Sequence, residues 1–162
     1  MLSSTRKKPK GLPAYREYLW QNKDKFPPDL FEWIICGLYY DFDSHLWPHD
    51  AWLESFTFKE HASGERDEIR KLGLEIKLLC ACHDHNITLT YSNIRSYKLS
   101  GIDMHSGFML NCHCDWIMDE YRISKNGFLI HEIEWAGLKP TARWLIECED
   151  ITLNIEKKLE KK

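Results

Sequence analysis

The sequence has no hydrophobic run long enough to cross a membrane. Its longest apolar stretch, at residues 34–40, is far shorter than the roughly 20 residues that a transmembrane helix needs. The first ten residues are basic, and no apolar segment of the length of an export signal follows them. We therefore expect a cytoplasmic protein without a membrane partner.

The common catalytic motifs are missing as well. The sequence contains no nucleophile elbow, phosphate-binding loop, dinucleotide fingerprint or helical HExxH pair. We therefore do not expect an enzyme. A small enzyme that uses His131 with Glu132 or Asp119 stays as a third alternative, for which the sequence indicates no substrate.

A basic surface over the body of the chain is also lacking. The two ends, residues 1–10 and 156–162, hold eight of the 22 basic residues and two of the 25 acidic ones. The body therefore has 14 basic and 23 acidic residues and a formal charge of −9, although the whole chain carries −3. Because phosphate binding needs a basic surface, this charge disfavours nucleic acid as a partner.

Apolar side chains are present in sufficient number for one core. The 162 residues are 43% hydrophobic and 13% aromatic, which is the composition of a folded domain. We expect a single domain over residues 1–162. Within it we place a flexible basic tail at 1–10, a helical segment at 13–38, a β-sheet region at 51–155 and a second basic tail at 156–162.

The spacing of hydrophobic residues changes along the chain. Apolar residues recur three or four positions apart in residues 13–24 and 29–38, which predicts one or two helices. Beyond residue 41 alternate positions are apolar, as at 87–91, which predicts strands with one buried face, among them residues 87–92 and 142–148. The expected fold class is α+β, mostly antiparallel β, with about seven to nine strands in a sandwich or a partly open barrel.

One local signal predicts a hairpin. Asn126 and Gly127 separate two segments of alternating hydrophobicity, and this dipeptide favours a two-residue type I′ turn. The hairpin would pair residues 116–124 with residues 128–135.

The predicted hairpin register places an acidic cluster on one face of the sheet. It sets Tyr121 opposite Glu132 and Asp119 opposite Glu134. Three carboxylates beside a tyrosine need water or a cationic partner. Two interpretations stay open, a solvated acidic face and a partner-binding surface, and catalysis by paired carboxylates is a third.

Four of the six cysteines form two close pairs, Cys80 with Cys82 and Cys112 with Cys114. Thiolates suit zinc, and histidines lie beside both pairs. Residues two apart on a strand are about 6.5–7 Å apart, however, which is too far for two sulfur atoms on one ion. We therefore favour free thiols that line a sheet face as small apolar side chains, with no cofactor, and keep zinc binding as the alternative.

The connection at residues 39–52 is rich in aromatic and acidic side chains. Loops of this composition often form binding rims, so Asp43 and Trp47 are further candidates for partner contact. We favour packing of Trp47 and Trp52 over the core, with partner contact as the alternative.

Five segments carry a resemblance to a group of small bacterial proteins. They are residues 49–54 (HDAWLE), 78–84 (LLCACHD), 119–124 (DEYRIS), 131–134 (HEIE) and 144–148 (WLIEC). Such proteins are similar to the immunity proteins of bacterial competition systems, which are compact, often acidic and bind a toxin domain. The resemblance covers about residues 45–155; it implies a protein partner and assigns no site residue.

These observations predict a non-catalytic protein-binding module. The partner would be a basic, nuclease-type toxin domain that the module neutralises as an immunity protein through an acidic and aromatic surface. The candidate contact residues are Asp119, Tyr121, Glu132 and Glu134, followed by Asp43 and Trp47. The alternative is a zinc-binding structural or catalytic β-domain built on Cys80, Cys82, Cys112 and Cys114.

Overall fold

The structure, a computed structural model, describes residues 11–36, 46, 48–100, 115–136 and 142–158. Two short helices open this part of the chain. Helix α1 (Leu12–Gln21) buries Tyr15 and Leu19, and helix α2 (Pro28–Ile35) buries four apolar side chains. A short 3-10 segment (Lys23–Lys25) lies between them. The predicted helices are confirmed, and none in the described part of the chain is long and apolar enough to span a membrane.

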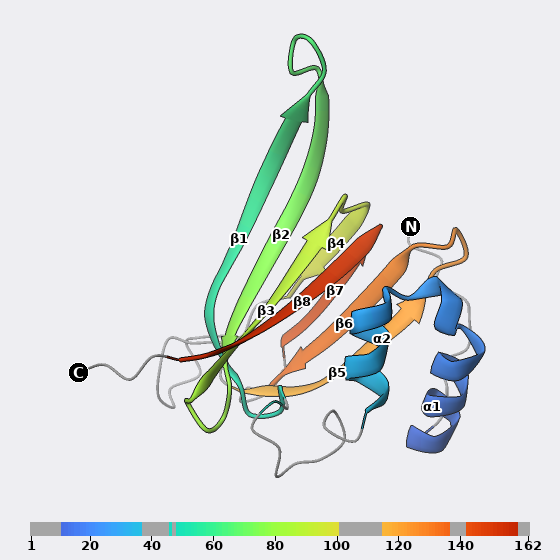
Figure 1. The fold of residues 1–162 in the computed structure, drawn as a ribbon, viewed down its shortest axis with the longest axis vertical. Helices are drawn as coiled ribbons and strands as arrows, with labels where there is room; N and C mark the ends of the chain where they lie inside the picture. The colour runs from blue at the N-terminus through green and yellow to red at the C-terminus, as the bar shows by residue number, and fades with distance from the viewer. Residues whose placement is uncertain (1–10, 37–45, 47, 101–114, 137–141, 159–162) are drawn as a thin grey trace.

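The described residues form eight antiparallel strands in two four-stranded sheets (Figure 1). The first sheet has the order β1 (Trp52–Ser63), β2 (Ile69–Leu79), β3 (His85–Ser92) and β8 (Asp150–Lys157). The second sheet has the order β4 (Ser96–Leu99), β7 (Ala142–Cys148), β6 (Leu129–Trp135) and β5 (Trp116–Ile123). The predicted class, mostly antiparallel β behind N-terminal helices, is confirmed; these strands do not close into a barrel.

One hydrophobic core lies between the two sheets. Ile76 of the first sheet and Ile133 of the second are fully buried, and burial of such a side chain contributes roughly 1.5–3 kcal/mol. The rings of Tyr91 on β3 and His131 on β6, both fully buried, stack across the core with 5.8 Å between their centroids. The inner face of each sheet therefore packs against that of the other.

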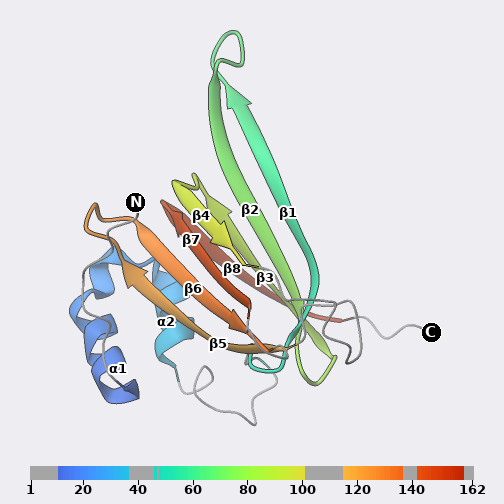
Figure 2. The same ribbon diagram turned by 180° about the vertical axis from the view of Figure 1, so that it is seen from behind.

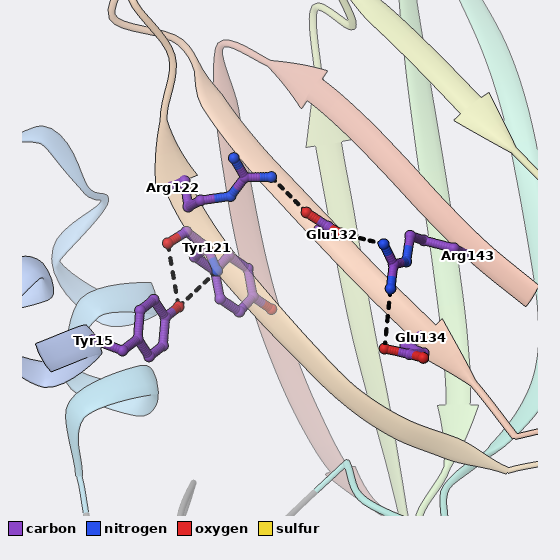
Figure 3. Close-up of polar contacts among 6 residues, drawn as sticks. All are labelled: Tyr15, Tyr121, Arg122, Glu132, Glu134 and Arg143. Carbon is purple, nitrogen blue, oxygen red and sulfur yellow. Dashed lines mark hydrogen bonds and ion pairs between the residues drawn. The ribbon is translucent and has the colours of Figure 1, made fainter. Parts of the chain in front are cut away.

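Helix α1 covers the outer edge of β5 (Figure 3). The hydroxyl of Tyr15 accepts a hydrogen bond from the backbone N–H of Tyr121 at 2.6 Å and lies 3.2 Å from the carbonyl oxygen of the same residue, to which it donates. The hydroxyl of Tyr18 accepts one from the N–H of Ile123 at 2.8 Å. Backbone groups on an edge strand need partners. The two tyrosines thus take the place of a neighbouring strand.

Strands β1 and β2 form a long hairpin whose outer end projects beyond the rest of both sheets (Figures 1 and 2). Pairing between the two strands continues out to Ser63 and Ile69. Every residue from 59 to 71 is exposed. The outer half of this hairpin therefore has no core on either of its faces.

The β5–β6 hairpin has a three-residue loop, and the predicted two-residue type I′ turn is wrong. The N–H of Ser124 bonds to the carbonyl of Phe128 at 2.8 Å, and the N–H of Gly127 bonds to the carbonyl of Ser124 at 3.1 Å. Among the loop residues 125–127 only Gly127 has a positive φ, 85°, whereas a type I′ turn needs two such residues. The loop is the common type I turn followed by a left-handed glycine.

The longer loop shifts the strand register by one residue. Tyr121 pairs with His131 rather than Glu132, and Asp119 pairs with Ile133 rather than Glu134. Side chains alternate between the two faces of a sheet. A register shift of one residue therefore places the side chains of one strand on the opposite face relative to those of the other strand. The predicted grouping of all four acidic-cluster residues on one face is therefore wrong.

Candidate functional site

The outer face of the second sheet carries charged side chains around an exposed methionine. Five residues line a shallow hollow there together with Asp119, and we call these five the glutamate face: Met118, Glu120, Glu132, Glu134 and Arg143. The side chain of Met118 is among the large exposed apolar ones, at 53%. Among the residues that the structure describes, none from the two helices lines this hollow.

Two arginines form ion pairs with the glutamates of β6 (Figure 3). Arg122 Nη2 lies 2.5 Å from Glu132 Oε2, and each side chain of this pair is only 11% exposed. Arg143 bridges two carboxylates, with Nη1 3.5 Å from Glu132 and Nη2 3.6 Å from Glu134. The side chain of Arg143 is 56% exposed, and exposed ion pairs at such distances are weak. The arrangement thus combines one fixed arginine with one that can be displaced.

The arginines also reduce the charge that was expected for this surface. Glu120, Glu132 and Glu134 carry three negative charges, against two positive charges on Arg122 and Arg143. The cationic partner that the carboxylates require is therefore supplied in part by the chain itself. The predicted register sets Tyr121 opposite Glu132, and its neighbour Arg122 then falls on the other face of the sheet, so this pairing was missed.

Asp119 and Tyr121, the other two predicted contact residues of this hairpin, lie in the core. The side chain of Asp119 is 3% exposed and Tyr121 is fully buried. A partner on the outer face cannot reach either side chain, so both leave the candidate surface.

Asp119 is part of a buried hydrogen-bonded chain. Its Oδ2 lies 2.8 Å from Nε2 of His131, and Nδ1 of His131 lies 2.7 Å from the hydroxyl of Tyr91. The ring of Tyr121 stacks on that of His131 with 3.9 Å between centroids. Burial raises the pKa of Tyr91 and Tyr121 well above the usual value, and the negative charge of Asp119 raises both further.

The order Asp119, His131, Tyr91 is that of a proton relay, but its position argues for a structural role. His131 and Tyr91 are fully buried, so a substrate has no path to the reacting atoms. Each polar atom in such a chain would be costly to leave unpaired. These hydrogen bonds between Asp119, His131 and Tyr91 therefore link β5, β6 and β3 across the core.

Cys80 and Cys82 do not line a sheet face together, as was predicted for them. Strand β2 ends at Leu79, and the next residues turn into the β2–β3 loop. Cys80 is buried and Cys82 is exposed, both as free thiols. The prediction that these two share a sheet face is therefore wrong. Cys112 and Cys114 lie outside the described residues.

The β2–β3 loop brings a different set of ligand atoms together. Sγ of Cys80 lies 3.2 Å from Oδ1 of Asp84, and Nδ1 of His85 lies 2.9 Å from the same oxygen. The pKa of the Cys80 thiol is raised by burial and by its hydrogen bond to Asp84, while the backbone N–H of His85 lowers it. Thiol, carboxylate and imidazole at these positions are potential ligands of a metal ion.

The aromatic connection contributes little to the described surface. Asp43 and Trp47 lie outside the described residues. Trp52 was predicted to pack over the core, but it is 50% exposed, and its ring lies against that of His83 with 4.6 Å between centroids. That prediction is wrong for Trp52.

Sequence reasoning missed most residues of the glutamate face because it predicted the wrong turn between β5 and β6. Met118 and Glu120 were placed on the opposite face from Glu132, and Arg143 was not paired with any residue. The signal that identifies them is Gly127 at the third loop position, which favours the type I turn with a following glycine bulge. No protein-family model matches this chain, and no curated protein matches its sequence.

Proposed function

We propose that the protein is a non-catalytic protein-binding module that docks a basic protein domain on the glutamate face. The observation that supports it is the shallow hollow in which the exposed side chain of Met118 lies beside three glutamates, two of which an exposed arginine bridges only weakly. A hollow of this kind offers an apolar contact beside carboxylate acceptors, and protein interfaces combine an apolar centre with polar groups at the rim.

Binding would proceed by exchange of cations. Arg143 lies 3.5 Å and 3.6 Å from Glu132 and Glu134, so a lysine or arginine of the partner can take its place at little cost. Arg122 stays with Glu132 in a nearly buried pair and fixes the orientation of that carboxylate. The acidic body of the chain would speed the encounter with a basic partner.

A role without catalysis agrees with the location of the titratable groups. The histidine and carboxylate that could act as acid and base, His131 and Asp119, face the core. Within the binding function, the resemblance to immunity proteins suggests an inhibitor that covers a basic toxin domain, with steric blocking as its mechanism.

The test begins with affinity capture from a lysate of the source organism. A captured protein is identified by mass spectrometry, purified and titrated against the wild-type chain and single variants by calorimetry. Glu134→Lys and Met118→Lys change exposed parts of the glutamate face. Glu75→Lys is the control, because it makes the same charge change at an exposed strand residue on the outer face of the first sheet, whereas the side chain of Glu134 is 26% exposed.

We expect a partner with a basic domain whose dissociation constant rises at least about tenfold with Glu134→Lys and with Met118→Lys. The control should bind as the wild type does, and affinity should fall as salt is added. A partner that binds both glutamate-face variants with unchanged affinity would rule this surface out.

A further inference from the structure

The β2–β3 loop has the composition and geometry of a metal site. It runs from Cys80 to His85, and its backbone is closed by hydrogen bonds from the N–H of Cys80 to the carbonyl of His85 at 3.1 Å and from the N–H of His83 to the carbonyl of Cys80 at 2.9 Å. His83 holds a left-handed conformation, with φ of 60°. The loop thus has a defined shape, in which Cys80, Asp84 and His85 are brought together at its base.

We propose that Cys80, Asp84 and His85 form a three-ligand site for a zinc ion. Their ligand atoms, Sγ, a carboxylate oxygen and an imidazole nitrogen, all lie within 4.8 Å of one another. A thiolate together with an imidazole selects zinc over magnesium or calcium, which prefer oxygen ligands.

The distances agree with a tetrahedral ion after a small widening. With zinc–ligand bonds of about 2.0–2.3 Å, ligand atoms in a tetrahedral site lie roughly 3.3–3.8 Å apart. The Sγ of Cys80 and Nδ1 of His85 lie 3.2 Å and 2.9 Å from Oδ1 of Asp84. An opening of a few tenths of an ångström brings these two distances into the tetrahedral range, while Sγ and Nδ1, which lie within 4.8 Å of each other, would both have to reach the same ion. On binding, the thiol of Cys80 loses its proton to solvent and His85 presents an unprotonated Nδ1.

The surroundings of the thiol also suit a metal-bound sulfur. The backbone N–H of His85 points at Sγ of Cys80 with a distance of 3.3 Å. Donors of this kind orient a ligand and share the charge of a thiolate. At the other side of the loop, the carbonyl of Asp84 accepts a hydrogen bond from the N–H of Lys158 at 2.7 Å. The site is therefore anchored to the end of β8.

Solvent can reach the ion from one side. Cys80 is buried, whereas the side chains of His85 and Asp84 are 22% and 36% exposed. Three protein ligands leave one tetrahedral position for water, as in zinc sites that bind or activate small molecules. Cys82, the other thiol of the loop, is exposed and does not belong to this group of atoms.

The experiment uses the full chain, freed of metal with a chelator and then titrated with cobalt(II), whose bond to a thiolate gives charge-transfer absorption in the near ultraviolet. Zinc is then added to displace cobalt, and the competition yields the zinc affinity. The variants are Cys80→Ser, Asp84→Asn and His85→Gln. Cys82→Ser and His83→Gln are matched controls within the same loop.

We expect one ion per chain, loss of the charge-transfer band in Cys80→Ser, and zinc affinity at least about tenfold weaker in Asp84→Asn and His85→Gln. Both controls should retain wild-type affinity. If the Cys80→Ser variant does not fold because Cys80 is buried, the zinc affinity of His85→Gln tests the site instead. His85 is partly exposed, so its replacement should leave the fold intact. Zinc should also raise the unfolding temperature of the wild type but not that of His85→Gln.

Three results would overturn the assignment. One is the absence of saturable binding, and another is a band that survives Cys80→Ser and disappears in Cys82→Ser. The third is unchanged affinity in His85→Gln together with loss of binding in a Cys112→Ser, Cys114→Ser double variant. That last result would favour the set of four cysteines instead.

Discussion

At the scale of single residues, the core of this protein contains ionisable groups that are held in their neutral form. Cys148 on β7 is fully buried, and burial, with a smaller effect of the charge on Asp150, raises the pKa of its thiol to about 12. The pKa values of the buried Tyr91 and Tyr121 are raised in the same direction. These groups ionise readily only after unfolding, so alkaline pH favours the unfolded chain.

The free energy of unfolding should therefore fall as pH rises above about 9. A folded-state pKa of about 12, above the ordinary thiol value of 9.0, means that the unfolded state binds fewer protons in this range. Stability is complete below pH 9 and declines by up to about 1.4 kcal/mol per pH unit for each such group. Urea unfolding at pH 7, 9 and 10 measures this decline, and Cys148→Ala should make it shallower between pH 9 and 10. Equal slopes in the two proteins would contradict the assignment to Cys148.

At the scale of elements, alternating hydrophobicity was sufficient to predict most of the strands. Residues 142–148 were expected as a strand and form β7, and the expected 87–92 lies within β3. Strand β4 was missed because its four residues are too few to show a period. The predicted β5–β6 register was wrong by one residue, because Asn126 and Gly127 occur in both candidate turns, which differ in loop length and in how many residues have positive φ.

Contacts between distant elements lay beyond sequence reasoning. The hydrogen bonds from Tyr15 to the backbone of Tyr121 join residues 106 positions apart. No local sequence pattern predicts that a tyrosine on a helix will hydrogen-bond to the edge of a strand. The same holds for Arg143 and its two glutamates, which meet only because β7 lies beside β6.

Removal of the Tyr15 hydroxyl should lower the free energy of unfolding. Tyr15→Phe leaves the buried N–H and carbonyl of Tyr121 without their partner, which costs about 1–3 kcal/mol. Urea unfolding measures the cost, and amide hydrogen exchange should speed up at Tyr121. Tyr97→Phe is the control, because Tyr97 is also on an edge strand but is 50% exposed. If both variants lose the same stability, the hydroxyl of Tyr15 does not support the strand edge.

At the scale of the whole molecule, the outer half of the β1–β2 hairpin stands apart from the core. All residues from 59 to 71 are exposed, and a two-stranded ribbon without a packed face is marginally stable by itself. The sandwich below it contains the buried side chains of both sheets. The hairpin tip thus depends on the sandwich, but the sandwich does not depend on the tip.

A shortened chain tests this dependence. Glu60 pairs with Leu72, so replacement of residues 61–71 by Asn-Gly joins the two strands with a two-residue turn. We expect the same fold by circular dichroism and a change in unfolding free energy within about 1 kcal/mol, since no buried side chain is removed. A loss of cooperative unfolding would mean that the tip supports the two sheets.

The position of β8 has a consequence for the order of events during synthesis. This C-terminal element pairs with β3 along its whole length, from His85 with Lys157 to Ser92 with Asp150, and α2 packs against it. Contacts between residues so far apart in sequence form late. The growing chain therefore carries an open β3 edge and an unpacked α2 until the ribosome has passed residue 157. In that interval its apolar faces are exposed to chaperones and to other nascent chains.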